Sequence, residues 1–125
     1  MTDETRGPPA ALAGDGPGDE PPVVVKIGGA EAVDPAGAVG DVADLVADRA
    51  VVVVHGGSTV VDETLGRLGI EPEYVESASG VTGRFTDAAT MEAFSMAMAG
   101  KLNTELTAQF RSAGVDAVGL SGVDG

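Results

Sequence analysis

The sequence predicts an α/β fold, a three-layer α/β/α sandwich built around a mainly parallel sheet. The prediction rests on two valine-rich runs, residues 23–27 and 51–54, each of which leads to a pair of glycines. Apolar runs of this length fit strands that are buried on both faces of a parallel sheet. Each run is followed by a segment with helical spacing, and this alternation favours right-handed crossovers that place helices on both faces.

The helix after the first run is expected to begin at an aspartate–proline pair. Asp34 predicts an N-cap and Pro35 the first helical residue. Apolar residues then recur at helical spacing up to Ala50. The acidic side chains expected on the opposite, solvent-facing side are Asp41, Asp44 and Asp48.

The helix after the second run is expected to begin at Ser58 or Thr59. Asp62 lies three residues after Thr59, which is the spacing of a capping box. Gly69 is expected to end the helix, because glycine readily adopts the left-handed conformation found there. The apolar residues expected to be buried are Val60, Val61, Leu65 and Leu68.

The pattern changes in the following segment. Two short extended pieces, residues 74–77 and 81–85, flank Ala78-Ser79-Gly80 and predict a β-hairpin. The second piece carries Arg84. Because arginine binds carboxylates through two parallel hydrogen bonds, Arg84 would suit an amino-acid substrate, and an exposed hairpin charge is the alternative.

A long helix with an apolar stripe is expected after the hairpin. Thr86 or Asp87 can cap it, Gly100 is expected to bend or split it, and Gly114 to end it. Residues 115–120 predict a further strand that leads into a loop at the top of the sheet. The stripe is interpreted as core, with Met91, Phe94 and Met98 on one face.

Composition excludes several classes of protein. The chain has 125 residues (12.3 kDa), which is enough for one domain with a core. Without cysteine it has no disulfide or thiolate metal site, and a single histidine, His55, excludes a histidine-rich one. No apolar stretch approaches the roughly 20 residues that span a membrane. The N-terminus lacks the apolar core of a secretory signal, so we expect a cytoplasmic protein.

The chain is strongly acidic. It has 20 acidic and 7 basic residues, and its net charge of −13 would repel nucleic acids and anionic membranes. This charge favours a protein from a salt-rich cytoplasm, where about 1 M salt screens repulsion beyond roughly 3 Å; an ordinary acidic protein is the alternative. Residues 1–22 are rich in proline and lack apolar periodicity, so they predict a disordered acidic tail before a domain at 23–125.

Lys26 and the glycines after it predict a phosphate site. The chain has only two lysines, so a lysine at a strand end is a functional candidate rather than a solubility residue. Its ammonium would stabilise a transferring phosphoryl group. Gly28 and Gly29 would let the backbone approach phosphates. The motif is neither GxGxxG nor a P-loop, which makes a dinucleotide-binding domain the least favoured alternative.

The second glycine pair predicts an anion site as well. Gly56, Gly57 and Ser58 precede or begin a helix, where free N–H groups and the helix dipole favour a carboxylate or phosphate. His55 is interpreted as a hydrogen-bonding residue at the strand end rather than a general base. Ser121 lacks the surroundings of a nucleophile, because no second histidine is present to activate it.

Together these motifs resemble the N-terminal half of the amino acid kinase family, most closely its acetylglutamate kinase group. The segments that carry the resemblance cover residues 23–125 and fall in the expected order: VVVKIGGAE, VVVVHGGS, GRFTD, KLN and VGLSGVDG. Ser58 in place of a third glycine, with the GRFTD and GLSGVDG segments, is similar to one branch of that group. That branch phosphorylates glutamate or aminoadipate carried on the amino-group carrier protein LysW, in arginine and lysine biosynthesis.

The resemblance implies an ATP-dependent kinase that turns the side-chain carboxylate of such a substrate into an acyl phosphate, with Mg²⁺ brought by ATP. It implies that Lys26 stabilises the γ-phosphoryl group and that Gly28 and Gly29 line the ATP phosphates. The residues implied to bind the substrate are Gly56, Gly57, Ser58 and Arg84. Family members are longer, so we expect an N-terminal part that is inactive alone and a full-length homo-oligomer.

Two other functions stay open from the sequence. An N-acetylglutamate kinase of arginine biosynthesis would share these motifs and act on free acetylglutamate. A non-catalytic module that binds an amino acid or an anion would share the glycine loops without turning over ATP.

Overall fold

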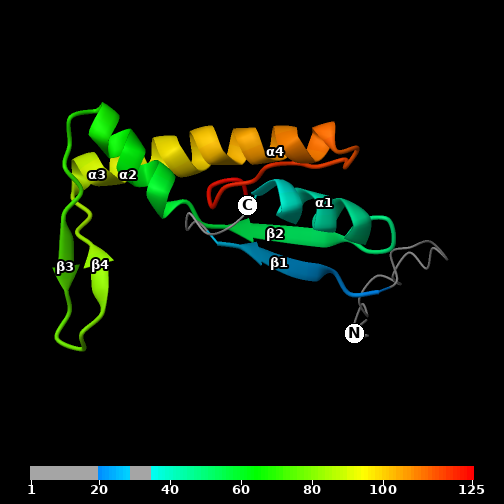
Figure 1. Cartoon of the computed structure of the whole chain (residues 1–125), viewed down its shortest axis with the longest axis horizontal. Coiled ribbons are helices and arrows are strands. Elements are labelled where there is room, and N and C mark those ends of the chain that lie inside the picture. The colour runs from blue at the N-terminus through cyan, green and yellow to red at the C-terminus, as the bar shows by residue number, and fades with distance from the viewer. Residues whose placement is uncertain (1–19, 29–34) are drawn as a thin grey trace, which may run out of the picture.

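The computed structural model describes residues 20–28 and 35–125. A small parallel sheet lies under two helices, and a hairpin projects from the far end of a long helical segment (Figure 1). In chain order the elements are β1 (Val23–Ile27), α1 (Pro35–Leu45), β2 (Val51–His55), α2 (Ser58–Arg67), β3 (Tyr74–Glu76), β4 (Thr82–Arg84), α3 (Ala88–Ser95), the π-helix η1 (Met96–Leu102) and α4 (Asn103–Ser112).

The sheet and the helices that cover it confirm the predicted α/β class. Strands β1 and β2 pair in parallel, with Val23 opposite Val51. Alternate side chains of both strands pack toward α1 and α4, where Ile27, Val42 and Phe110 are buried in a common core. Helices α1 and α4 therefore lie over the same face, so the described residues supply two of the three predicted layers (Figure 1).

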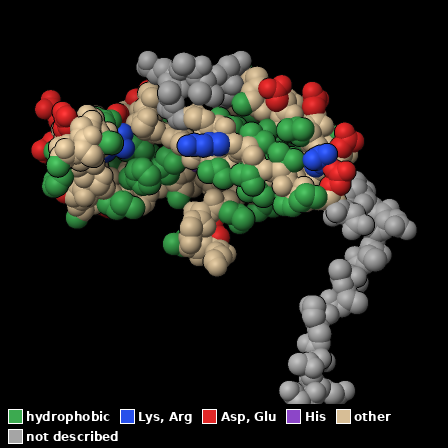
Figure 2. Space-filling model, turned by 90° about the horizontal axis from the view of Figure 1, so that it is seen from below, with side chains coloured by type: hydrophobic (Ala, Val, Ile, Leu, Met, Phe, Trp, Pro, Cys, Tyr) green, Lys and Arg blue, Asp and Glu red, His purple; other side chains and the backbone are tan. Residues whose placement is uncertain are grey.

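The opposite face of the sheet is exposed in the part of the chain that the structure describes. The side chains of Val24, Val52 and Val54 are 66%, 50% and 49% exposed. Lys26 lies on the same face, in register with Val54. The underside of the molecule shows hydrophobic side chains around a basic one, with acidic side chains toward both ends (Figure 2). These valines are the surface that the third predicted layer would cover.

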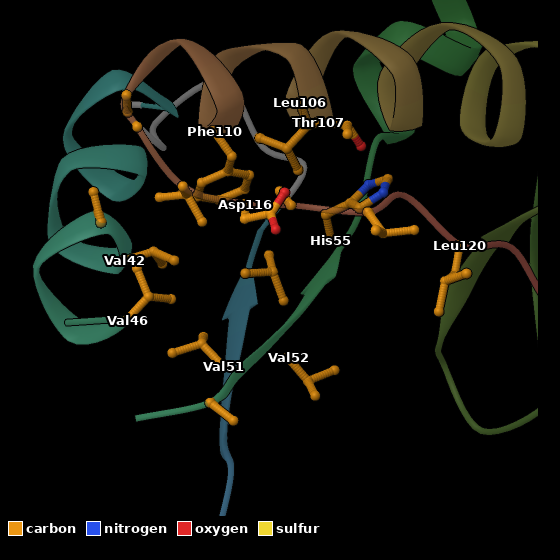
Figure 3. Close-up of a pocket in the computed structure, with 18 of the residues that line it drawn as sticks. Val42, Val46, Val51, Val52, His55, Leu106, Thr107, Phe110, Asp116 and Leu120 are labelled. Atoms are coloured by element: carbon orange, nitrogen blue, oxygen red, sulfur yellow. The ribbon is translucent and has the colours of Figure 1, made fainter. Parts of the chain in front are cut away.

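The predicted strand over residues 115–120 is wrong. The segment has alternating half-buried and exposed residues but is not hydrogen-bonded to β1 or β2. It packs against α4, where a Cβ at Gly119 would lie 2.5 Å from Thr107 Oγ1 and 2.7 Å from Asn103 Oδ1. The segment, α1, β2 and α4 line a cavity of about 870 Å³ (Figure 3). The segment therefore packs beside α4 and the core without joining the sheet as a strand.

Helix boundaries follow the local signals closely. Helix α1 begins at Pro35, as predicted, whereas Asp34 lies outside the described residues. The helix ends at Leu45, short of the predicted Ala50. Helix α2 ends before Gly69, whose φ of 73° is the left-handed conformation that terminates helices.

The residues buried where α2 meets α3 and η1 differ in part from those predicted. Helix α2 packs against α3 and η1 through a second core of Val61, Leu65, Ala93 and Ala97. Leu68 and Met91, which helical spacing predicts to be buried, are 51% and 50% exposed. Phe94 and Met98 are partly buried against this core. Small residues face α2 here because two helices approach closely only where side chains are short.

The segment after the hairpin forms nearly continuous helix. Asp87 caps α3, because its carboxylate accepts a hydrogen bond of 2.8 Å from the Thr90 N–H. Gly100, where the sequence predicts a bend, lies within the π-helix η1. Helix α4 follows directly and ends before Gly114, which has a φ of 86°.

Most of the predicted tail, residues 1–22, lies outside the described residues. Within the described part, Glu20 forms an ion pair with Arg49 at 2.7 Å, which joins the start of β1 to the turn before β2. None of the helices found in residues 20–28 and 35–125 is long and apolar enough to cross a membrane.

Candidate functional site

The two glycine loops meet at one edge of the sheet. Because β1 and β2 are parallel, both carboxyl ends lie at this edge. The Gly56 N–H donates a hydrogen bond of 3.0 Å to the Ile27 carbonyl, which places the second loop beside Gly28. Gly28 is exposed, and Gly29 lies outside the described residues. Gly56 therefore joins the two loops, and its N–H is already used in the hydrogen bond to the Ile27 carbonyl.

Lys26 lies on the exposed face of β1, close to this edge. The alternation of β1 directs its side chain away from the core under α1 and α4. No residue that the structure describes forms an ion pair with it. A lysine in this position can offer its full charge to an anion that approaches the strand ends.

Gly57 has a structural role that the sequence does not reveal. A Cβ at this position would clash with Leu102 Cδ1 and lie 2.7 Å from Met98 Sδ. Both side chains come from the π-helix η1, and π-helical turns often occur at functional sites. The side chains of η1 therefore pack against Gly57, and the role of Gly57 in substrate binding stays a prediction.

The N-terminus of α2 lies at the same edge. Helix α2 begins at Ser58, which is exposed. The N-cap residue of this helix is Gly57, which makes no side-chain capping hydrogen bond. The predicted capping box is wrong: the Asp62 carboxylate instead accepts hydrogen bonds from Arg84 and Tyr74. Gly57 thus provides no side-chain cap, and the dipole at this helix start favours negative charge.

Arg84 joins the hairpin to the start of α2. Its Nε and Nη2 donate to Asp62 Oδ1 at 3.0 and 2.7 Å. Nη2 also lies 3.1 Å from the Ser58 carbonyl and 3.1 Å from the Tyr74 hydroxyl. The Arg84 side chain is only 12% exposed. The structure thus brings two of the predicted substrate residues, Arg84 and Ser58, into direct contact.

Sequence reasoning missed Asp62 and Tyr74 as members of this cluster. The Tyr74 hydroxyl donates to Asp62 Oδ2 at 2.6 Å, and this hydrogen bond raises the pKa of Tyr74 because the neutral phenol is the donor. Tyr74 is the cross-strand partner of Arg84, with the guanidinium 5.5 Å from its ring centre. The predicted hairpin, which brings residues 74–77 beside residues 81–85, was therefore the one available signal for Tyr74.

Other candidate residues make local hydrogen bonds. His55 Nδ1 lies 3.3 Å from the Gly56 carbonyl oxygen, which confirms a hydrogen-bonding role at the strand end. The Ser121 hydroxyl donates to Asp124 Oδ2 at 3.0 Å, and the Ser121 N–H donates to the same oxygen at 2.6 Å. These bonds, led by the backbone one, lower the pKa of Asp124 and close the turn at residues 121–124.

The cavity in Figure 3 is separate from most of this site. Its lining is mainly apolar, and Lys26, Gly28, Ser58 and Arg84 do not contribute to it. Only His55, among the strand-end residues, does. We therefore locate the candidate site at the carboxyl edge of the sheet and the start of α2.

Comparison with known proteins shows the family of the chain. Residues 21–125 match the profile of the amino acid kinase family. The chain belongs to that family. It is 42% identical over 104 residues to a LysW-aminoadipate kinase of Deinococcus radiodurans, covering 82% of this chain and 36% of that protein.

Archaeal relatives show a similar match. Over 103 residues the chain is 37% identical to a protein of Nitrosopumilus maritimus named LysW-aminoadipate/LysW-glutamate kinase, covering 82% of the chain and 39% of that protein. A Pyrobaculum aerophilum protein of the same name is 43% identical over 102 residues, with 82% of the chain and 38% of that protein covered. The chain thus spans less than two fifths of the length of these curated relatives.

Proposed function

We propose that this chain is the substrate-side part of an ATP-dependent kinase that phosphorylates the side-chain carboxylate of a LysW-linked aminoadipate or glutamate. The observation that carries the proposal is a continuous set of contacts at one edge of the sheet. Gly56 joins the two glycine loops through Ile27, and Arg84 contacts the start of α2 at Ser58. These contacts support the proposal because they bring the residues assigned to phosphate and those assigned to the carboxylate to the same edge, as transfer between two anions would require.

The phosphoryl side of the site is assigned to Lys26, Gly28 and Gly29. The Lys26 ammonium would stabilise charge on the transferred γ-phosphoryl group, and the glycines would line the ATP phosphates. Mg-ATP would supply the phosphoryl group. Among the described residues no group of three side chains could hold a metal ion, so we assign the Mg²⁺ to ATP rather than to this part of the chain.

The substrate side is assigned to the start of α2 and Arg84. The dipole and N–H groups at Gly57 and Ser58 attract a carboxylate, and the arginine provides a charged hydrogen-bond donor beside them. Gly56 orients this loop through its bond to Ile27. The amino acid would be held by its α-carboxylate, so that its side-chain carboxylate can reach the phosphoryl group and form an acyl phosphate.

The biological setting follows from the relatives and from composition. The relatives' names support LysW as the carrier and amino-acid biosynthesis, in the lysine or arginine pathway, as the process. A net charge of −13 supports a cytoplasmic protein that does not bind nucleic acid or anionic membranes. We further propose that the complete enzyme is a homo-oligomer.

A hydroxylamine trap tests the function directly, because acyl phosphates react with hydroxylamine to give stable hydroxamates. The complete protein is incubated with Mg-ATP and either LysW-linked aminoadipate, LysW-linked glutamate or free N-acetylglutamate. Hydroxamate from a LysW-linked substrate supports the proposal. Product from acetylglutamate alone would replace it with an acetylglutamate kinase, and binding without product would indicate a non-catalytic module.

A further inference from the structure

The Arg84 guanidinium has an uneven set of partners. Nε and Nη2 together make four hydrogen bonds, to Asp62, Tyr74 and the Ser58 carbonyl. Nη1 has no hydrogen-bond partner among the described residues. Nη1 therefore keeps hydrogen-bond donors that the described residues do not use.

Asp62 and Tyr74 restrict how this arginine can move. Asp62 lies on α2, one turn after Ser58, and its two carboxylate oxygens bind Arg84 and Tyr74 separately. Tyr74 lies opposite Arg84 across the hairpin and also contacts the guanidinium through its hydroxyl. The planar guanidinium is thus fixed from the helix on one side and from the strand on the other.

We infer that Asp62 and Tyr74 are positioning residues that hold Arg84 so that Nη1 faces the substrate's α-carboxylate at the start of α2. The inference rests on the proposed function. It adds two residues that do not touch substrate themselves. Their effect is to pre-organise a long side chain, so that substrate binding does not have to order it.

The charge on Asp62 has a second consequence. Paired with Asp62, Arg84 contributes little net charge, so the remaining attraction for a carboxylate comes from directed hydrogen bonds and from the α2 dipole. Such a site selects for the position of the carboxylate rather than for negative charge in general. A carboxamide at this position offers one acceptor oxygen instead of two, because its NH₂ group cannot accept a hydrogen bond from the arginine or from the helix N–H groups, so we expect it to bind more weakly.

The test compares two substrates in the complete protein. One is the LysW-linked amino acid, and the other is its α-carboxamide analogue, which keeps the side-chain carboxylate that is phosphorylated. Asp62→Ala should raise KM for the first about fivefold with kcat within about twofold, as expected for the loss of one ordered side chain. For the carboxamide, wild type and Asp62→Ala should have the same KM.

Tyr74→Phe provides a milder variant, since it keeps the ring and removes only the hydroxyl. It should raise KM for the LysW-linked amino acid by about twofold and leave KM for the carboxamide analogue unchanged. Asp116→Ala is the matched control, because Asp116 pairs with Arg111 at 3.5 Å and takes no part in the site. It should leave KM for both substrates unchanged.

The outcomes separate this inference from the proposed function. A KM that rises equally for both substrates in Asp62→Ala and Tyr74→Phe would mean that the cluster only maintains the fold. Unchanged KM values in both variants, with an increase in Arg84→Ala, would overturn the positioning role and leave the carboxylate site intact. No change of KM in Arg84→Ala would remove Arg84 from the proposed site altogether.

Discussion

Leu102 occupies the space that a side chain at residue 57 would need. The contact links the π-helix η1 to the loop between β2 and α2, two segments that are far apart in sequence. The loop that presents the start of α2 thus packs against the side chains of Leu102 and Met98, which a side chain at residue 57 would have to displace.

Gly57→Ala should destabilise the protein. The new methyl group would displace Leu102 and Met98, and overpacking of this kind costs about 1–3 kcal/mol. Urea unfolding followed by circular dichroism measures the loss. Gly66→Ala is the control, because a Cβ there meets nothing within 4 Å and the helical position favours alanine by about 0.5–1 kcal/mol. Equal stability of the two variants would contradict the contact with η1.

Lys26→Ala should greatly reduce turnover of the complete protein. If its ammonium stabilises the transferred phosphoryl group, kcat should fall about 100- to 1000-fold, the usual effect of removing one such donor. Hydroxamate formation under saturating ATP provides the rate. Lys101→Ala is the matched control, since Lys101 is the second lysine and is paired with Glu105 at 2.7 Å. A Lys26 variant as active as the Lys101 variant would remove Lys26 from the reaction.

Asp87 should make stability depend on pH in the acidic range. The hydrogen bond from the Thr90 N–H lowers the pKa of Asp87 below its ordinary value of 3.8. Because the folded pKa is the lower one, this stabilisation is present above pH 3.8 and is lost as pH falls through the folded pKa. Asp87→Asn keeps a capping side chain but cannot titrate.

The measurement is the midpoint of urea unfolding at several pH values. Near neutral pH, wild type should be slightly more stable than Asp87→Asn, and it should lose this excess stability as the pH falls below about 4. Asp87→Ala should be the least stable of the three at neutral pH, because it lacks the cap. A pH dependence that is identical in wild type and Asp87→Asn would show that other carboxylates dominate acid unfolding.

The sequence predicted those features that depend on neighbouring residues. Valine-rich strands, a proline at the start of α1, the Asp87 cap and the glycine ends of α2 and α4 all arise from interactions within a few residues. Both glycine loops could be placed at one edge because parallel strands dictate it. The family resemblance was correct for the same reason, since it rests on short motifs in a fixed order.

The features that the sequence did not reveal depend on distant contacts. Asp62 has the spacing of a capping residue, but Arg84, which is 22 residues away, is the stronger partner for its carboxylate. Residues 115–120 have the composition of a strand, but no local signal shows that Gly119 packs against α4. Met91 follows helical spacing, yet the surface that faces α2 is set by the small residues Ala93 and Ala97.

The exposed valine face has a thermodynamic consequence for Lys26. Val24 lies on the same strand face as this lysine, and Val54 lies opposite it, so a surface that covered the valines would lie against the stem of Lys26 and would remove water from the ammonium group wherever it reached the end of the side chain. A cation that has lost its hydration is stable only beside an opposite charge. Covering this face and binding an anion at the strand ends therefore favour each other, and by linkage each strengthens the other by the same factor.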